Sequence, residues 1–268
     1  MYKLIALDMD GTLLNSQKQI SLRTQQAIAK AREQGIKVVL ASGRPLAGMQ
    51  DKLELLHLTS DQDYVLHYNG SMVQNVGTGE VIYQQIIDGR SAKRVAQLAK
   101  ELGVNTHAFS QIHGLITPKV SQYTEVEANI NGISITEMDF DQLEDDHPII
   151  KAMIVAEPEV LTATIAKIPA EFYRDFTIVQ SAAFFVEFLN PKSNKGIGVQ
   201  AIAEHLGIQA SEVMCMGDAE NDHHMLQYAG LGIAMDNAME ETKRIADHIT
   251  LSNDQDGVAV AIEQFALR

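Results

Sequence analysis

The chain has 268 residues, of which 46% are hydrophobic and 21% charged, and its formal net charge is −14. This length provides one large domain or two medium ones with a buried core, and the composition excludes a disordered, collagen-like or low-complexity chain. The negative charge argues against a nucleic-acid binder and against an anionic membrane surface as partner, because both require a basic face on the protein.

The single cysteine, Cys215, excludes an internal disulfide and a cysteine-based zinc site. No apolar run reaches the roughly 18–20 residues of a membrane helix, and the N-terminus becomes acidic too soon for a signal peptide. We therefore expect a cytoplasmic protein with no membrane partner.

Apolar runs alternate with helical patterns over the first part of the chain. A helix is predicted to start at Ser21 and another after Ser42, and strands are predicted at 3–7, 37–41, 64–68, 72–76 and 80–86, the last two as a hairpin. This order implies right-handed βαβ crossovers and a parallel sheet.

From about Gly89 the pattern changes to a mixed α+β order. Helices are predicted at 91–102, near 120–130 and at 158–169, and strands at 106–110, 113–117, 151–156, 176–182 and 184–189. The α/β pattern resumes at Asn194, with helices at 195–206, from Asp218, at 238–246 and from Asp256, and strands at 213–216, 231–234 and 248–251. We predict a discontinuous core, 1–86 and 190–268, interrupted by an inserted α+β domain at 87–189.

The sharpest motif is DMDGT at 8–12, which follows the first predicted strand. Asp8 and Asp10 place two carboxylates two residues apart, and Gly11 permits a sharp turn. In open α/β sheets the binding crevice lies outside the carboxyl ends of the strands. An aspartate alone often caps a turn, but further polar motifs at equivalent places favour a catalytic pair.

Two such motifs follow later strands. Ser42 and Gly43 offer a hydroxyl and backbone N–H groups that suit a phosphate oxygen, although Ser42 by itself is also a good helix N-cap. The motif GDAEND at 217–222 is predicted to open a helix that presents Asp218 and Asp222 on one face, with Asn221 beside them.

Carboxylates converging on one crevice repel each other unless a cation lies among them. Oxygen ligands select a hard ion, which predicts Mg²⁺ together with waters and phosphate oxygens. Four carboxylates, one Mg²⁺ and Lys195 sum to −4 + 2 + 1 = −1. A bound phosphate would therefore be held jointly by Lys195, backbone N–H groups and helix dipoles.

With these residues in view, the chain resembles the haloacid dehalogenase superfamily, and most of all its Cof-type, class IIB sugar phosphatases. The resemblance rests on motifs in the family order: DMDGTL at 8–13, SGRP at 42–45, YNG at 68–70, NKG at 194–196, GDAEND at 217–222 followed by Met225 and Leu226, and AMDNA at 234–238. It implies a Rossmann-like, doubly wound parallel-sheet core with an inserted α+β cap domain. It also implies a Mg²⁺-dependent phosphatase that acts on small phosphorylated metabolites, with sugar phosphates as the family default.

The resemblance implies a role for each matching residue. Asp8 would be the nucleophile that forms an aspartyl-phosphate, and Asp10 the general acid and base. The phosphate would be held by Met9, Ser42, Gly43, Lys195 and Asn221. The Mg²⁺ would be bound by Asp8, the Asp10 carbonyl and Asp218, with support from Asp222. Arg44 is expected either to pair with an acidic residue near the site or to contact the ligand.

Three alternative functions remain at this stage. A phosphomutase of the same superfamily would pass the phosphoryl group to a second hydroxyl, and no sequence feature here favours transfer. A receiver domain would be about half this length and would lack the second aspartate at Asp10. A non-catalytic phosphosugar-binding regulator is expected to have lost Asp8 or Asp10, and both are present.

Four other residues could carry chemistry, but a structural role is favoured for each. His223 and His224 are adjacent on a predicted helix and point about 100° apart, so they do not easily share one metal ion. Cys215 lies within a predicted buried strand and is expected to be inert. A substrate contact for His107 is the less favoured interpretation.

Overall fold

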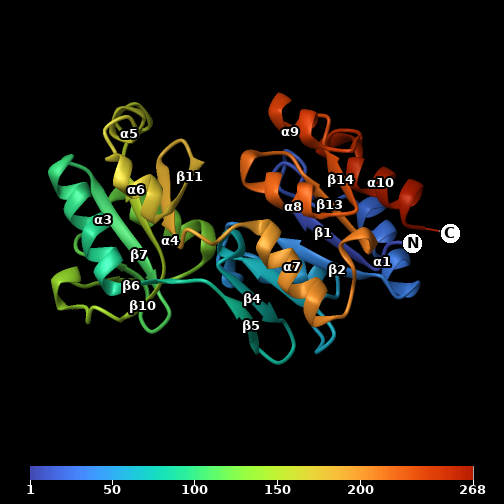
Figure 1. Cartoon of the computed structure of the whole chain (residues 1–268), viewed down its shortest axis with the longest axis horizontal. Helices are drawn as coiled ribbons and strands as arrows, with labels where there is room; N and C mark the ends of the chain where they lie inside the picture. The colour runs from blue at the N-terminus through green and yellow to red at the C-terminus, as the bar shows by residue number, and fades with distance from the viewer. Residues whose placement is uncertain (268) are drawn as a thin grey trace. The chain divides into compact units, whose positions relative to one another are not determined.

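The computed structural model describes residues 1–267, which form two compact units (Figure 1). The core unit comprises Met1–Gln84 and the chain from Asn194 onward, and the insert unit comprises Gln85–Ser193. The core unit therefore consists of two segments far apart in the sequence. None of the helices in the described residues is long and apolar enough to cross a membrane.

The core unit contains an eight-stranded sheet in the order β15-β14-β13-β1-β2-β3-β4-β5. Its parallel strands are β1 (Leu4–Asp8), β2 (Lys37–Ala41), β3 (Tyr64–His67), β13 (Val213–Gly217), β14 (Leu231–Ala234) and β15 (His248–Ile249). The hairpin strands β4 (Met72–Asn75) and β5 (Val81–Gln84) extend the sheet antiparallel. The strand order reverses at β1, which lies between β2 and β13, and a ligand crevice is expected at such a point.

Helices cover both faces of the core sheet. Ile5 and Leu7 of β1 pack in a buried cluster with residues of α1 (Leu22–Glu33), α2 (Gln50–Leu55) and α10 (Gly257–Phe265). Leu4 and Ala6 pack on the other face with residues of α7 (Lys195–His205) and α8 (His223–Tyr228). Burial on both faces explains why the parallel strands read as continuous apolar runs rather than alternating ones.

Short elements complete the core unit. They are the α-helix α9 (Glu240–Ile245) and the 3₁₀ turns η1 (Leu46–Gly48), η2 (Tyr68–Gly70), η4 (Ala210–Glu212), η5 (Glu220–Asp222) and η6 (Asn253–Gln255). Local capping sets the start of α1, because the Ser21 side chain accepts a hydrogen bond from the Thr24 backbone N–H.

The insert unit has a seven-stranded sheet in the order β11-β12-β10-β7-β8-β9, with β6 paired to β10. Its strands are β6 (Ile87–Asp88), β7 (Asn105–Ser110), β8 (Gly114–Thr117), β9 (Ile135–Glu137), β10 (Pro148–Val155), β11 (Thr177–Ala182) and β12 (Phe185–Leu189). Its helices are α3 (Gly89–Glu101), α4 (Gln122–Asn131), α5 (Pro158–Ile165) and α6 (Ala170–Asp175), with the 3₁₀ turn η3 (Phe140–Gln142). Residues of α3, α5 and α6 share an apolar cluster with residues of β7, β10 and β12.

One predicted helix of the insert unit is wrong in its extent. The helix expected at 158–169 ends at Ile165, and a second helix starts at Ala170. Pro169 stands at the N-cap of the second helix with extended backbone, and a proline disfavours helical backbone in the residue before it. The proline therefore divides the predicted helix into α5 and α6.

Strand β3 ends in a buried histidine without polar partners. His67 is 3% exposed, and neither ring nitrogen has a hydrogen-bond partner among the described residues. The Tyr68 ring lies 5.1 Å away, centroid to centroid. Burial lowers the pKa of His67 to about 4, because the charged imidazole would lose its hydration without gaining an acceptor.

This low pKa predicts a loss of stability in mild acid. An unfolded histidine has a pKa of about 6.5, so the unfolded chain binds the proton first as the pH falls. The contribution of His67 is therefore complete above about pH 6.5 and decreases by roughly 1.4 kcal/mol per pH unit towards pH 4. Urea unfolding at about pH 7 and pH 5 measures this effect. Between these pH values the free energy of unfolding of the wild type should fall by roughly 2 kcal/mol more than that of the non-titrating variant His67→Gln. Equal losses of unfolding free energy in the two proteins would contradict the low pKa of His67.

Candidate active site

Apart from Lys195, which opens α7, the predicted site residues lie at the carboxyl ends of three adjacent parallel strands or in the turns that follow them. Asp8 is the last residue of β1, Ser42 directly follows β2, and Asp218 directly follows β13. Asp8 is in register with Ala41, the residue before Ser42. Because β1 lies between β2 and β13, the strand ends bring these residues to one edge of the sheet.

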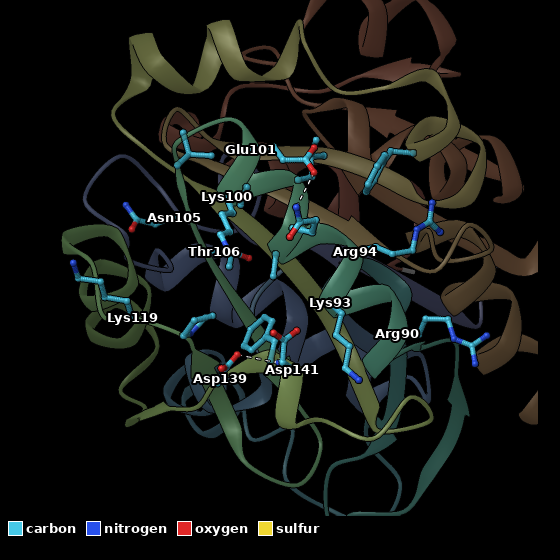
Figure 2. A pocket seen from close by; sticks show the side chains of 18 of the residues that line it. Arg90, Lys93, Arg94, Lys100, Glu101, Asn105, Thr106, Lys119, Asp139 and Asp141 are labelled. Atoms are coloured by element: carbon cyan, nitrogen blue, oxygen red, sulfur yellow. Dashed lines mark hydrogen bonds between the residues drawn. The ribbon is translucent and has the colours of Figure 1, made fainter.

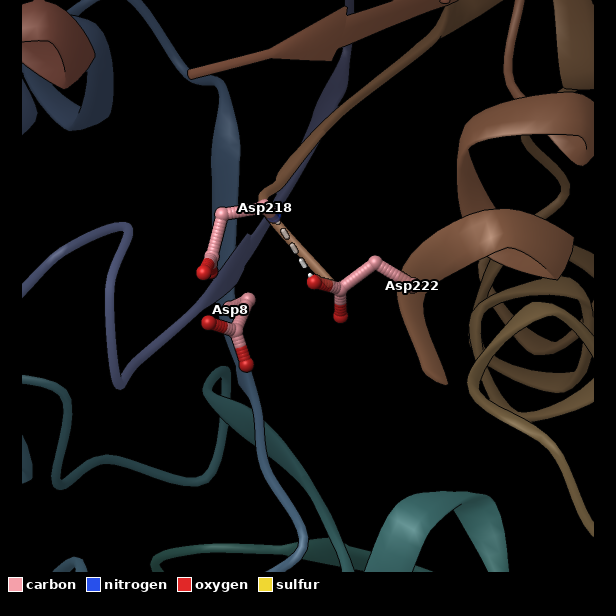
Figure 3. A group of neighbouring side chains, drawn as sticks. All are labelled: Asp8, Asp218 and Asp222. Atoms are coloured by element: carbon pink, nitrogen blue, oxygen red, sulfur yellow. Dashed lines mark hydrogen bonds between the residues drawn. The ribbon is translucent and has the colours of Figure 1, made fainter. Parts of the chain in front are cut away.

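A cluster of three carboxylates lies at this edge (Figure 3). Asp8, Asp218 and Asp222 each offer an oxygen, and these oxygens all lie within 4.8 Å of one another. Asp8 and Asp222 are buried, and Asp218 is partly buried. Among the described residues this is the one group of three or more histidine, cysteine or acidic side chains placed to hold a metal ion.

Lys195 connects two of these carboxylates. Its Nζ lies 2.5 Å from Asp8 Oδ1 and 2.6 Å from Asp222 Oδ1, and its side chain is fully buried. Burial alone would lower the pKa of Lys195, but the charges of Asp222 and Asp8 outweigh burial and raise it. The lysine is therefore an ammonium ion that occupies a fixed position between two acids.

The hydrogen bonds of Asp222 contradict the prediction that a helix opens at Asp218. Its Oδ2 accepts hydrogen bonds from the backbone N–H groups of Asp218 at 2.9 Å and Ala219 at 3.1 Å, so the segment forms a turn and α8 starts only at His223. The expectation that Asp218 and Asp222 share one helix face is therefore wrong. Asp222 instead caps the 3₁₀ turn η5, whose N-cap is Ala219, so Asp218 stays outside the helical segment.

Asp218 is held against the DMDGT turn. Thr12 Oγ1 donates a hydrogen bond of 2.9 Å to Asp218 Oδ1. Gly11 has φ +92°, and a Cβ at this position would lie 2.3 Å from Asp218 Oδ2. A side chain at Gly11 would be strained by the left-handed backbone and would displace the Asp218 carboxylate, which favours glycine here.

The carboxylate cluster carries an excess of negative charge. Burial and the neighbouring Asp222 raise the pKa of Asp8 well above its ordinary range, despite the opposing charge of Lys195. Burial and Asp222 also raise the pKa of Asp218. A cation beside these oxygens would favour the ionised carboxylates and reverse both shifts.

The donor atoms of the cluster fit a hard divalent cation. All are carboxylate oxygens, the ligand type that Mg²⁺, Ca²⁺ and Mn²⁺ prefer. Asp222 already accepts three hydrogen bonds, from Lys195, Asp218 and Ala219, whereas a cation needs free oxygen lone pairs. Asp8 and Asp218 are therefore the side chains that could bind the ion directly, and Asp222 could orient the loop that carries Asp218.

The Asp10 side chain lies outside this cluster and forms ion pairs with two basic residues. Arg44 donates two hydrogen bonds, from Nε to Oδ2 at 2.9 Å and from Nη2 to Oδ1 at 2.8 Å, and Lys18 Nζ lies 2.8 Å from Oδ1. Burial raises the pKa of Asp10, but the bonds from Arg44 and Lys18 outweigh burial and lower it. Of the two roles expected for Arg44, the structure shows the ion pair.

Apart from Lys195, the predicted phosphate-binding residues lie in the turns that follow β1, β2 and β13. Ser42 is buried, and its hydroxyl accepts a hydrogen bond of 3.2 Å from the Arg44 backbone N–H, so it caps a turn rather than a helix. Met9 is buried, and its carbonyl accepts from the Leu14 N–H at 2.8 Å. A Cβ on Gly43 would lie 2.9 Å from Asn69 Nδ2.

Three residues that contact the predicted set carried no role in the sequence analysis. Thr12 binds Asp218, Lys18 binds Asp10, and Asn69 Oδ1 accepts from Asn221 Nδ2 at 3.1 Å. Thr12 and Asn69 belong to the recognised motifs DMDGT and YNG, but the motifs do not indicate which residues Thr12 and Asn69 contact. Lys18 had no sequence signal, because only the fold brings it beside Asp10.

The remaining candidates have structural surroundings. His223 Nε2 lies 2.9 Å from Thr242 Oγ1, and neither His223 nor His224 belongs to a metal-binding group of the described residues. Cys215 is buried, and burial raises the pKa of its thiol, which makes the thiolate scarce. His107 is fully buried inside the insert unit between Thr124 and Met153.

The insert unit has an open hollow of about 990 Å³ (Figure 2). None of the predicted site residues lines this hollow. Its lining includes charged side chains of both signs, namely Arg90, Lys93, Arg94, Lys100, Glu101, Lys119, Asp139, Asp141 and Glu171. Its basic side chains are partly neutralised, since Arg94 pairs with Asp175, and Arg90 and Lys93 both pair with Asp145.

Comparison with known proteins identifies the family. The haloacid dehalogenase-like hydrolase profile matches residues 5–262. The chain is 39% identical over 269 residues to "Putative phosphatase YxeH" of Bacillus subtilis, covering 100% of this chain and 99% of that protein. A haloacid dehalogenase-like hydrolase structure from Bacteroides thetaiotaomicron has a TM-score of 0.86 and 32% identity, with 98% and 99% of the two chains covered. The subclass IIB sugar phosphatase BT4131 has a TM-score of 0.79 and 26% identity, with 98% of each chain covered.

The chain therefore belongs to the haloacid dehalogenase-like hydrolases, in their class IIB, and is an enzyme of the phosphatase type. The predicted family, the α/β fold class and the enzyme class are confirmed.

The contact between Gly11 and Asp218 predicts a specific defect in cation binding. In Gly11→Ala the new Cβ displaces the Asp218 carboxylate, so the affinity for Mg²⁺ or Mn²⁺, measured by calorimetry, should fall at least about tenfold. Gly35→Ala is the matched control: Gly35 has φ +83° and nothing within 4 Å of its Cβ position. Both variants bear the strain of a left-handed alanine, but Gly35→Ala should keep wild-type affinity. Equal weakening in the two variants would refute a local effect at Asp218.

Proposed function

We propose that this enzyme is a Mg²⁺-dependent phosphatase that hydrolyses small phosphorylated metabolites, with sugar phosphates as the first class to test. The proposal rests above all on one observation, the largely buried cluster in which Asp8, Asp218 and Asp222 meet the ammonium of Lys195. The similarity to a subclass IIB sugar phosphatase supports the choice of substrate class.

Asp8 acts as the nucleophile in this proposal. A carboxylate oxygen of Asp8 attacks phosphorus, the bond from phosphorus to the substrate oxygen breaks, and an aspartyl-phosphate forms. Lys195 lies 2.5 Å from Asp8 Oδ1, so it keeps the nucleophile oriented and offsets the charge of the phosphoryl group. Burial of the pair excludes water from the nucleophile.

Asp10 moves the protons. It donates a proton to the leaving alkoxide and later accepts one from the water that attacks the aspartyl-phosphate. With Arg44 and Lys18 bound its pKa is lowered, which suits the base and opposes the acid. The acid step therefore requires Asp10 to separate from at least one of these partners.

The phosphate oxygens bind to donors in the turns after the strands. We assign this role to Ser42, to the backbone N–H groups of Met9 and Gly43 and to Asn221, together with the Lys195 ammonium at the start of α7. Neutral N–H and O–H donors suit this site, because they hold an anion without demanding further countercharge.

Asp8, the Asp10 backbone carbonyl and Asp218 would hold Mg²⁺. When bound, the ion supplies positive charge beside the transferring phosphoryl group. Asp222 keeps the Asp218 loop in place through its bonds to the Asp218 and Ala219 N–H groups. Mg²⁺ is preferred over Zn²⁺ because the donor set offers neither histidine nor cysteine.

The insert at 87–189, between core segments 1–86 and 190–268, acts as the α+β cap domain in this proposal. It would supply contacts to the leaving group, since the core motifs account for the phosphoryl group alone. Substrate preference would then depend on residues of the insert rather than on the strand-end motifs.

Removal of the nucleophile is the first test. Asp8→Asn should lower the hydrolysis of p-nitrophenyl phosphate at least about 10³-fold, because an amide does not form the acyl-phosphate. Asp51→Asn is the control, since Asp51 is exposed on α2, and it should retain wild-type kcat/KM. Normal turnover in Asp8→Asn with an intact fold would disprove the nucleophile assignment.

Removal of the metal is the second test. Treatment with EDTA should abolish hydrolysis of p-nitrophenyl phosphate, and added Mg²⁺ should restore it, because the carboxylate cluster needs a hard cation. The metals Mn²⁺, Ca²⁺ and Zn²⁺ are compared in the same assay. Restoration by Zn²⁺ alone, or turnover that survives EDTA, would count against the proposal.

A further inference from the structure

The turn after β3 has an unusual backbone. Tyr68, Asn69 and Gly70 all have positive φ angles, of 51°, 55° and 88°. Two consecutive residues other than glycine in the left-handed region are rare, because their Cβ atoms crowd the backbone. Asn69 is 3% exposed, so this conformation is held inside the core unit rather than at its surface.

The same turn contacts three other segments that carry predicted site residues. These are the turn after β2, the turn after β13 and the start of α7. The Asn69 N–H donates to the Ser42 carbonyl at 2.9 Å, and the Asn69 side chain packs against Gly43. Asn221 Nδ2 donates to Asn69 Oδ1 at 3.1 Å. A Cβ on Gly70 would lie 2.1 Å from the carbonyl oxygen of Asn194, the residue before Lys195.

The bond between the two asparagines determines how the Asn221 amide is oriented. An asparagine amide has two N–H bonds and one carbonyl, and a half-turn about the side chain exchanges donor and acceptor. With the Asn69 amide oriented so that Oδ1 faces Asn221, the Asn221 amide must present an N–H to it, which selects the orientation shown. Its second N–H then remains a donor, as a phosphate oxygen requires.

The side chain of Asn69, and not its backbone, is what makes this contact specific. A glycine would adopt φ 55° without strain, so the turn alone does not require asparagine. What asparagine adds is an acceptor for Asn221 and an amide that packs on Gly43, where a Cβ would come within 2.9 Å.

We propose that Asn69 is a positioning residue for the phosphate site: it orients the Asn221 amide so that the free N–H faces a phosphate oxygen. The inference rests on the proposed function in one respect, the assignment of Asn221 as a phosphate contact. Asn69 itself need not touch the substrate.

The test replaces Asn69 by glycine, which keeps the left-handed turn and removes the amide. Binding of inorganic phosphate in the presence of Mg²⁺ is measured by calorimetry, and p-nitrophenyl phosphate hydrolysis is measured in parallel. We expect Asn69→Gly to raise the Kd for phosphate and the KM about tenfold, with kcat changed less than about threefold, because a contact to the phosphoryl group is lost in ground and transition states alike.

A double-mutant cycle distinguishes positioning from a merely structural role. If Asn69 acts through Asn221, the double variant Asn69→Gly/Asn221→Ala should bind phosphate no more weakly than Asn221→Ala alone. His57→Gly is the matched control, because His57 is an exposed residue with φ 57°, and it should keep the wild-type Kd. Thermal unfolding of all variants checks that the fold is retained.

The outcomes separate this inference from the proposed function. Wild-type phosphate affinity in Asn69→Gly, or effects that multiply in the double variant, would overturn the positioning role while leaving phosphatase activity untouched. A wild type that binds phosphate without hydrolysing the aryl ester would overturn the proposed function, and weaker binding by Asn69→Gly would still support the positioning role.

Discussion

The site depends on the buried ammonium of Lys195 between Asp8 and Asp222. A buried charge is costly unless oppositely charged groups surround it, and loss of one partner leaves the others unpaired. Asp8 and Lys195 are 187 residues apart in sequence, so the 2.5 Å contact joins the two segments of the core unit. The same contact therefore contributes to the fold and, in the proposed mechanism, orients Asp8.

Strand order explains why a large insert leaves this contact intact. β1 lies between β2 from its own segment and β13 from the second one, and it pairs with both in parallel register. The ends of β1, β2 and β13 then meet at one edge, whatever is inserted between Gln84 and Asn194. The positions of the strand-end carboxylates therefore follow from strand pairing within the core unit.

Local charge balance reconciles an acidic protein with an anionic substrate. The structure separates Asp10, which Arg44 and Lys18 neutralise, from the cluster of Asp8, Asp218 and Asp222. Three carboxylates and Lys195 sum to −3 + 1 = −2, and a divalent cation would bring the cluster to zero. In the proposed function, a phosphate meets a neutral cluster ringed by N–H and O–H donors, so we expect its binding to depend on the metal far more than on the net charge of −14.

The sequence by itself determined the α/β class and the motifs that follow the strands, because apolar periodicity and short polar motifs are local properties. Only the tertiary structure decided which partners these motifs have. The helical segment predicted to open at Asp218 begins later, because the Asp222 side chain accepts from the Asp218 and Ala219 N–H groups and caps a 3₁₀ turn that starts at Glu220. The pairing of Asp10 with Lys18 and of Asn69 with Asn221 was likewise absent from the sequence pattern. Both contacts depend on the three-dimensional arrangement of turns at the sheet edge, which local sequence patterns do not specify.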